Sequence, residues 1–433
     1  MTQLEKIKKN NIYYRLLWAY VNSIFRKVYR RVEYHGAEKL PVNGSVILAP
    51  NHTNTFMDAM AVSFSVKNRK IFVARADIFK KPWMIKGLTF LKILPINRMR
   101  DGVKNLSKNE GINDMVVDAL REEIYFCIFA EGTHRMKHGL LPLGKGICRI
   151  ALQANANFGE SKPLYIIPLG MEYGHFFRFC SSVLVQIGEP FNVTQFIENH
   201  SHLEEPELIN TLKETIALQM KETILYIPDD QNHTGTLELC HLWSDRQRKR
   251  LGLPKKSLVN NFLAAKQTVS DISHLLQNQP EEAQKWIEEA EHFSKQRHKK
   301  GIRIPSMHRE NPRASLCLKA LLLIVGLPYF VVSALVSAPT TLLAEWICTK
   351  MKDEAFHNTV RFLIILFFYP LSLLLIFIPL LVAFPCCWAL AGIALAVPSV
   401  FYVYYYLRLL RLFISDIKWM ANKTLRLEFE RFK

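Results

Sequence analysis

The feature that most constrains this chain is a set of long apolar segments in its last third. After Cys317, the segments Leu321–Val336, Phe362–Ala383 and Ala389–Leu407 each approach or reach the roughly 17 to 25 apolar residues that cross a bilayer. The 49% apolar content of the chain is concentrated in these segments. We therefore expect an integral membrane protein whose C-terminal transmembrane helices form a membrane domain over residues 314–410.

The basic residues around these segments limit the topology. Three crossings would place the basic loop near Lys352 and the basic C-terminal tail, residues 411–433, on the opposite side of the membrane from the rest of the chain, which the positive-inside rule disfavours. We therefore expect Leu318–Trp346, which contains two prolines, to form a re-entrant or interfacial hairpin. Phe362–Ala383 and Ala389–Leu407 are then the predicted transmembrane pair.

The formal net charge of +18 limits the class of partner. Nucleic acid is not expected, because no zinc finger, helix-turn-helix or base-stacking signature is evident. Anionic lipid fits basic residues that flank apolar segments, although an ordinary positive-inside flank explains them equally well. The eight cysteines show no C-x-x-C spacing and lie mostly in apolar runs, so they are predicted to be reduced packing residues.

The N-terminal region, residues 1–33, is predicted to be a basic amphipathic helix. Tyr13–Val32 places apolar residues at helical spacing with arginines and lysines between them, which is typical of a helix in the membrane interface or of an amphipathic packing helix. Met1–Asn11 is polar and charged, unlike a signal peptide. The soluble part is therefore expected on the cytoplasmic side.

Short apolar runs alternate with helical stretches between residues 34 and 200. This alternation predicts an α/β fold with a mixed sheet flanked by helices, in one catalytic domain. The expected strands are Ser45–Ala49, Lys70–Ala74, Ile93–Ile96, Ile124–Phe129, Leu164–Leu169 and Val183–Ile187, and the expected helices are Thr55–Val66, Asn113–Glu122 and Lys145–Ala156.

Residues 201–313 form a charged helical region. Its first helix places Leu208, Leu212, Ile216 and Met220 on one face, and Pro280 opens another helix at the position where proline is tolerated. No residue pattern in this region points to chemistry. It is expected to connect the catalytic and membrane domains, with packing on the catalytic domain or contact with a carrier protein as alternatives.

Two motifs carry chemistry. His52 follows the strand-like run Ser45–Ala49 and precedes Asp58, and Glu131-Gly132-Thr133 follows a later strand. An imidazole that titrates near neutrality removes a proton from a hydroxyl, and a carboxylate fixes its tautomer. This combination predicts an enzyme.

In order and spacing, these motifs resemble the glycerolipid acyltransferase family, which esterifies glycerol-3-phosphate or 1-acylglycerol-3-phosphate (lysophosphatidate). The resemblance covers about residues 34–191. It implies that His52 is the general base that deprotonates the acceptor hydroxyl as it attacks an acyl thioester, and that Asp58 holds the imidazole, with no covalent acyl-enzyme required. The family usually has four residues between histidine and aspartate, whereas this chain has five. His52 is therefore expected in the turn before the helix, where the extra residue is absorbed.

The resemblance also implies residues that bind a phosphate-bearing acceptor. Arg98 ends a strand similar to the family's second block and is the leading phosphate ligand, since guanidinium binds phosphate through two hydrogen bonds. The other candidate substrate-binding residues are Glu131, Gly132, Thr133 and Lys145, with Arg75, Arg100 and Lys80 as weaker candidates. Glu131 is expected either to orient an acceptor hydroxyl or to hold an arginine in place.

The resemblance thus predicts a membrane-bound O-acyltransferase of phospholipid biosynthesis. It implies acyl-CoA or acyl carrier protein as acyl donor, no cofactor, no metal, and membrane lipid as a partner. Two alternatives stay open: an acyltransferase that acts on another lysophospholipid or an aminolipid, and a catalytically silent membrane protein that binds phosphatidic acid. The sequence does not distinguish the donors, the acylated hydroxyl or the chain length.

Overall fold

The computed structural model describes residues 3–9, 11–97, 109–158, 162–254 and 257–432. Its contacts divide the chain into two compact units. The first comprises Met1–Phe25, Val32–Phe176 and Val183–Ile224, and the second comprises Arg26–Arg31, Phe177–Ser182 and Leu225–Lys433. Each unit is described by itself.

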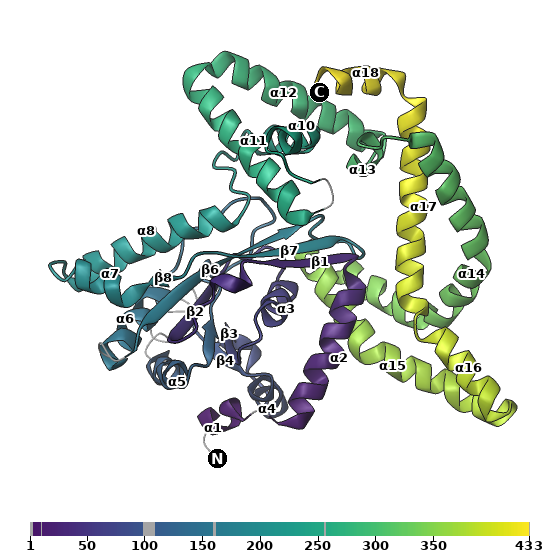
Figure 1. Ribbon diagram of the computed structural model, residues 1–433. Coiled ribbons are helices and arrows are strands. Elements are labelled where there is room, and N and C mark those ends of the chain that lie inside the picture. The colour runs from purple at the N-terminus through teal and green to yellow at the C-terminus, as the bar shows by residue number, and fades with distance from the viewer. Residues whose placement is uncertain (1–2, 10, 98–108, 159–161, 255–256, 433) are drawn as a thin grey trace. The chain divides into compact units, whose positions relative to one another are not determined.

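The first unit is built on a mixed sheet flanked by helices (Figure 1), as the sequence predicted. In the described part of the chain the sheet has eight strands in the order β1-β7-β6-β2-β5-β3-β4, with β8 paired to β6. The strands are β1 (Arg31–His35), β2 (Ser45–Pro50), β3 (Lys70–Arg75), β4 (Ile93–Ile96), β5 (Tyr125–Cys127), β6 (Leu164–Tyr173), β7 (Ser182–Ile187) and β8 (Phe191–Asn192). Strands β6, β2, β5, β3 and β4 run parallel, whereas β7 and β8 pair antiparallel with β6.

The helices of this region alternate with the strands. They are α1 (Gln3–Lys8), α2 (Ile12–Val28), α3 (Phe56–Ser65), α4 (Pro82–Phe90), α5 (Glu110–Arg121), α6 (Gly146–Phe158), α7 (Val193–Asn199) and α8 (Glu205–Thr223), with 3-10 turns η1 (Ala37–Lys39) and η2 (Ala76–Ile78). A hydrophobic core joins β2, β5 and β6 to α5, α6 and α8. Strand β2 is buried at all its positions because it pairs on both edges and is covered on both faces, which explains its unbroken apolar sequence.

Helix α8 packs on this sheet. Its predicted apolar face is confirmed: Leu212, Ile216 and Met220 are buried in the same core. At Gly170 of β6, an added Cβ would lie 1.8 Å from the carbonyl oxygen of Thr223, the last residue of α8. The missing side chain at Gly170 lets the helix end approach the strand, so α8 belongs to the first unit although it follows the predicted boundary at residue 200.

The second unit is helical. Its elements are α9 (His233–Leu242), α10 (Ser244–Arg250), α11 (Leu258–Asn278), α12 (Pro280–Lys299), α13 (Ile304–Met307), α14 (Pro312–Lys350), η6 (Glu354–Phe356), α15 (His357–Ala383), α16 (Cys386–Ala396), α17 (Ser399–Ala421) and α18 (Lys423–Arg431). Buried residues of α9, α12, α17 and α18 share one core, and Glu238 is buried against Arg297 with 2.7 Å between oxygen and nitrogen. Pro280 opens α12 as expected.

Two of these helices, α14 and α15, are long and apolar enough to cross a membrane, and the pair α16 and α17 gives up to three spans among the described residues. The hairpin predicted for Leu318–Trp346 is wrong: this segment lies within the single helix α14 (Figure 1), and Pro328 and Pro339 are inside that helix. An internal proline removes only one backbone donor, and neighbouring helices in such segments compensate for the loss.

The break falls instead in Ala389–Leu407, which was predicted to be one uninterrupted span. Helices α16 and α17 meet at a bend of 40°, with Pro398 between them. The Tyr369 hydroxyl donates to the Ala396 carbonyl and accepts from the backbone N–H of Val400, 3.4 Å away. One buried side chain therefore satisfies backbone groups on both sides of the break.

Candidate active site

Two parallel strands bring the sequence motifs together. Strands β2 and β5 pair with Leu48 opposite Cys127. His52 follows Leu48 by four residues, and Glu131 follows Cys127 by four, so both lie beyond the carboxyl ends of adjacent strands. Ligands in parallel sheets bind at this edge. The backbone N–H of His52 donates to Glu131 Oε1 at 2.7 Å.

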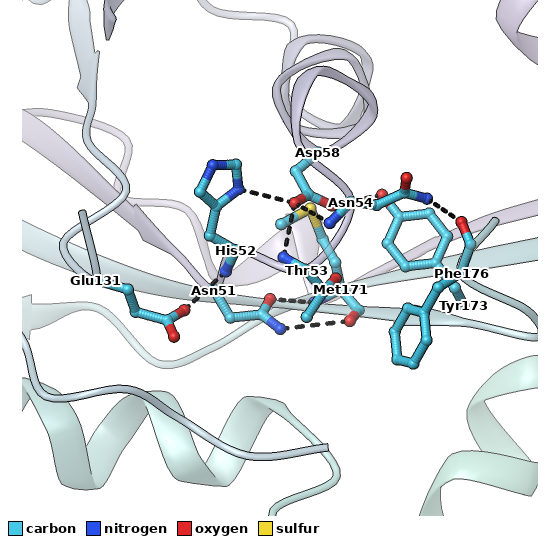
Figure 2. Close-up of polar contacts among 9 residues, drawn as sticks. All are labelled: Asn51, His52, Thr53, Asn54, Asp58, Glu131, Met171, Tyr173 and Phe176. Atoms are coloured by element: carbon cyan, nitrogen blue, oxygen red, sulfur yellow. Dashed lines mark hydrogen bonds and ion pairs between the residues drawn. The ribbon is translucent and has the colours of Figure 1, made fainter. Parts of the chain in front are cut away.

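The imidazole of His52 is paired with Asp58 (Figure 2). Nδ1 of His52 lies 2.9 Å from Oδ2 of Asp58. Asp58 is fully buried in the first turn of α3, whereas the His52 side chain is 19% exposed. The imidazole packs against the ring of Phe129, with 4.4 Å between centroids. The ring is therefore fixed on one side and open to solvent on another.

Asp58 is held by three further donors. Its Oδ2 accepts from the backbone N–H groups of Thr53 at 2.8 Å and Asn54 at 2.7 Å, and its Oδ1 accepts from the Tyr173 hydroxyl at 2.7 Å. An ionised carboxylate only accepts hydrogen bonds, so Nδ1 of His52 carries the proton. The lone pair of the imidazole is then on Nε2, which points away from Asp58 in Figure 2.

The turn before α3 accommodates the extra residue between histidine and aspartate. His52 lies in this turn, as expected, and Asp58 is the third residue of the helix. Thr55, just before the helix, has φ +46° and ψ −122°, a conformation that β-branched residues rarely adopt. Strain of this kind persists only where surrounding contacts impose it. The four donors to Asp58 supply such contacts here.

Glu131 holds two loops together. Its Oε1 accepts from His52 N, and its Oε2 accepts from the backbone N–H of Leu141 at 2.9 Å. Burial raises the pKa of Glu131 to about 7, although the two backbone hydrogen bonds oppose this rise. Both carboxylate oxygens are bonded to backbone amides of this chain. The contacts therefore make Glu131 a positioning residue for the histidine loop.

Three residues of the site were not predicted to take part in it: Asn51, Asn54 and Tyr173. The Asn51 side chain exchanges hydrogen bonds with the backbone of Met171, at 2.8 and 3.5 Å, and Asn54 Nδ2 donates to the Phe176 carbonyl at 2.6 Å. Together with Tyr173 they tie the histidine turn to the end of β6. Asn51 and Asn54 flank His52, and this proximity was the available signal; Tyr173 is remote in sequence and offered none.

The remaining predicted residues surround this centre. Gly132 adopts φ +63° directly after Glu131, and Thr133 follows it, half-buried. Lys145 is exposed immediately before α6, and exposed Arg75 is paired with Asp77 at the end of β3. Among the described residues, no hydrogen bond or ion pair joins Lys145 or Arg75 to His52. Arg98 and Arg100 lie outside the described residues, and Lys80 is exposed.

Two comparisons with known proteins found similarities. Residues 31–172 match the family model described as Acyltransferase. A solved structure similar to this chain is the 1-acyl-sn-glycerophosphate acyltransferase from Thermotoga maritima, with 19% identity over 48% of this chain and 78% of that chain, and a TM-score of 0.35. The comparison with curated proteins found no match. Residues 31–172 of this chain are thus similar to the acyltransferase family.

Proposed function

We propose that this protein is a membrane-bound acyltransferase that moves a fatty acyl group from a thioester to glycerol-3-phosphate or 1-acylglycerol-3-phosphate. The observation that carries the proposal is the pairing of a partly exposed imidazole, His52, with a fully buried carboxylate, Asp58. In this arrangement Nδ1 donates to Asp58 and Nε2 is the base. Acyl-CoA or acyl carrier protein is the proposed donor, and no cofactor is needed.

The proposed reaction is a direct transfer. Nε2 of His52 takes the proton of the acceptor hydroxyl while the hydroxyl oxygen attacks the thioester carbonyl carbon. The tetrahedral intermediate then breaks the carbon–sulfur bond, and the thiolate leaves with the proton that His52 held. Asp58 stabilises the imidazolium between the two steps. The products are an ester and a free thiol, so the proton and electron pairs balance.

The acceptor phosphate requires fixed positive charge near His52. Arg98 remains the candidate drawn from the sequence. Arg135 is a second candidate, because its backbone N–H donates to the His52 carbonyl at 3.1 Å, which places this residue beside the base. A planar guanidinium matches a phosphate through paired hydrogen bonds.

We propose that helices of the second unit attach the protein to a membrane. Helices α14 and α15 have the length and hydropathy of membrane spans, and α16 with α17 supplies a third candidate. An acyltransferase that uses a lipid acceptor benefits from this attachment, because its acceptor and product partition into the bilayer. We place the acyltransferase domain and the basic tail, residues 411–433, on the cytoplasmic side, which the positive-inside rule favours and which requires an even number of crossings.

The test is a matrix of the purified full-length protein against both donors and both acceptors, with radiolabelled acyl groups. His52→Ala is expected to lower kcat by at least about 100-fold, because general-base catalysis contributes that much or more. The matched control is His200→Ala, which removes an imidazole of the same unit whose Nδ1 lies 2.8 Å from the Phe196 carbonyl oxygen. Wild-type rates in His52→Ala would contradict the proposed base. Absence of turnover in every combination would favour a silent lipid-binding protein instead.

A further inference from the structure

Five arginines of the second unit gather at one place along α17. This arginine cluster consists of Arg30, Arg178, Arg303, Arg408 and Arg411. Tyr404, Arg408, Arg411 and Ser415 recur at spacings of four, three and four residues, so they share one face of α17 over about 16 Å. The other three arginines come from separate segments that contact this face.

Contacts at both ends of this face place the other arginines. Phe179, the neighbour of Arg178, packs edge-on against Tyr404 with 5.0 Å between ring centroids. The backbone N–H of Arg303 donates to the Ser415 hydroxyl at 2.8 Å. Arg178 and Arg303 therefore approach Arg408 and Arg411 from opposite ends of the same helix face.

Arg30 reaches the cluster through a pair of backbone hydrogen bonds. The N–H of Cys180 donates to the Val28 carbonyl at 2.7 Å, and the N–H of Arg30 donates to the Ser181 carbonyl at 2.8 Å. These bonds join the end of α2 to the segment that carries Arg178. The guanidinium groups of Arg30, Arg408 and Arg411 all lie within electrostatic range of Cys180.

The cluster lacks acidic partners. Among the residues that the structure describes, no carboxylate lies within 4.0 Å of any of the five guanidinium groups, whereas Arg297 and Arg361 in the same unit each have one. Burial, together with the charges of Arg178, Arg411 and Arg408, lowers the pKa of Arg303 to about 10. Like charges held together repel one another, and a bound anion relieves that repulsion.

The position of the cluster on α17 indicates the source of the anion. The residues before Arg408 include Tyr402, Tyr404, Tyr405 and Tyr406. Tyrosines concentrate where a membrane span meets water, and basic residues next to them lie at the level of the lipid phosphates. Arg30, Arg178 and Arg411 are exposed, so a headgroup can reach them.

We propose that the arginine cluster binds the phosphate of an anionic phospholipid headgroup in the surrounding leaflet. The inference rests on the membrane insertion proposed above and is independent of acyl transfer. The cluster holds the guanidinium groups on several segments around one helix face, which suits the tetrahedral phosphate better than a single basic flank does. A phospholipid bound there also links the segment at Arg30, the segment at Arg178 and α17.

The experiment measures binding of phosphatidylglycerol to the full-length protein in neutral detergent by native mass spectrometry. Phosphatidylglycerol is chosen because it is neither substrate nor product of the proposed reaction, and a His52→Ala background removes turnover. Arg408→Gln/Arg411→Gln is expected to weaken the first bound lipid by about 30-fold, which corresponds to the loss of two interfacial basic contacts. Arg408→Lys/Arg411→Lys should recover much of the affinity, since the charge returns.

The matched control is Arg250→Gln/Arg431→Gln, which removes the same charge from two exposed ion pairs of the same unit. It should change the affinity by less than about twofold. If Arg408→Gln/Arg411→Gln does not fold, Arg30→Gln/Arg178→Gln, on two exposed side chains, decides the question with the same expected direction.

Three outcomes would overturn the proposal. One is unchanged lipid affinity in the folded cluster variant. Another is an equal loss in the control, which would mean a general charge effect. The third is displacement of phosphatidylglycerol by equimolar inorganic phosphate, which would assign the cluster to a soluble phosphate. Retained phosphatidylglycerol binding by a protein that fails every acyl-transfer assay would uphold the cluster and reject only the proposed reaction.

Discussion

Asp58→Asn isolates the negative charge behind the imidazole. An asparagine can place its amide oxygen where Oδ2 accepts from Thr53 and Asn54, and its NH2 group can donate to the Tyr173 hydroxyl in place of the present bond. The oxygen still accepts from Nδ1 of His52, so tautomer and geometry are retained. The lost quantity is the charge assistance of that bond.

A hydrogen bond to a charged group contributes about 1.5 to 3 kcal/mol. Applied to the imidazolium in the transition state, this loss lowers kcat by about 10- to 150-fold. The KM for the acceptor should not change, because Asp58 is fully buried and does not reach substrate. Initial rates with saturating donor, over a range of acceptor concentrations, measure both constants.

The control is Asp77→Asn, which removes a half-exposed carboxylate that pairs with Arg75 in the same unit. It should leave kcat unchanged. An Asp58→Asn enzyme with kcat within about twofold of the wild type would refute the reasoning, since the charge would then stabilise no transition state. A raised KM with normal kcat would refute it as well, because it would place Asp58 in substrate binding.

Three further variants test the surroundings of the pair. Tyr173→Phe removes one donor to Asp58 and should lower kcat by less than Asp58→Asn does, with unchanged acceptor KM in the same assay. Burial raises the pKa of Glu131 from 4.5 to about 7, so the stability that this carboxyl group contributes is present at low pH and is lost as the pH rises through 7. The thermal midpoint of the wild type, measured relative to that of Glu131→Gln, should therefore fall as the pH rises from 4.5 to 7. Gly170→Ala places a Cβ 1.8 Å from a carbonyl oxygen of α8, so it should destabilise the protein by about 1 to 3 kcal/mol in thermal unfolding. The control is Gly111→Ala, whose Cβ has no heavy atom within 4 Å and which should not destabilise the protein.

The sheet could be predicted because its central strands are buried on both faces. Such strands are short unbroken apolar runs between polar turns, and Ile93–Ile96 was predicted with its observed bounds. Strands β1 and β8 were missed. Neither contains a fully buried residue, so their sequences lack the apolar signal, and their pairing depends on strands remote in the chain.

The candidate site could be predicted only where its residues are close in sequence. His52 and Asp58 are linked by a turn, and their contact is local. The bond between Tyr173 and Asp58 joins residues 115 positions apart, and the Glu131 contacts are with backbone amides, which no side-chain pattern reveals. The sequence therefore predicted the pairing of His52 with Asp58, but not the groups that hold the pair.

For the membrane helices, the sequence predicted the position of the apolar segments but not the breaks between helices. Hydropathy located the apolar segments, but proline alone did not reveal where a helix breaks. Pro328 and Pro339 lie within continuous α14, whereas Pro398 lies at a bend. At the bend, the Tyr369 hydroxyl donates to the Ala396 carbonyl and accepts from the backbone N–H of Val400. Whether a proline interrupts a helix therefore depends on the packing of helices, which hydropathy does not show.

His52 and Glu131 each lie four residues after a pair of opposite residues in adjacent strands, and this equal spacing has a consequence for engineering. Each residue stands four positions past its partner in the Leu48 and Cys127 pair, so loop length alone brings the amide to the carboxylate. One added residue in either loop shifts the His52 amide or the Glu131 carboxylate by about 3.3 Å, more than a hydrogen bond tolerates. Libraries that vary side chains in loops of fixed length should thus keep the hydrogen bond between the His52 amide and Glu131. Insertion of a single residue in either loop should break it.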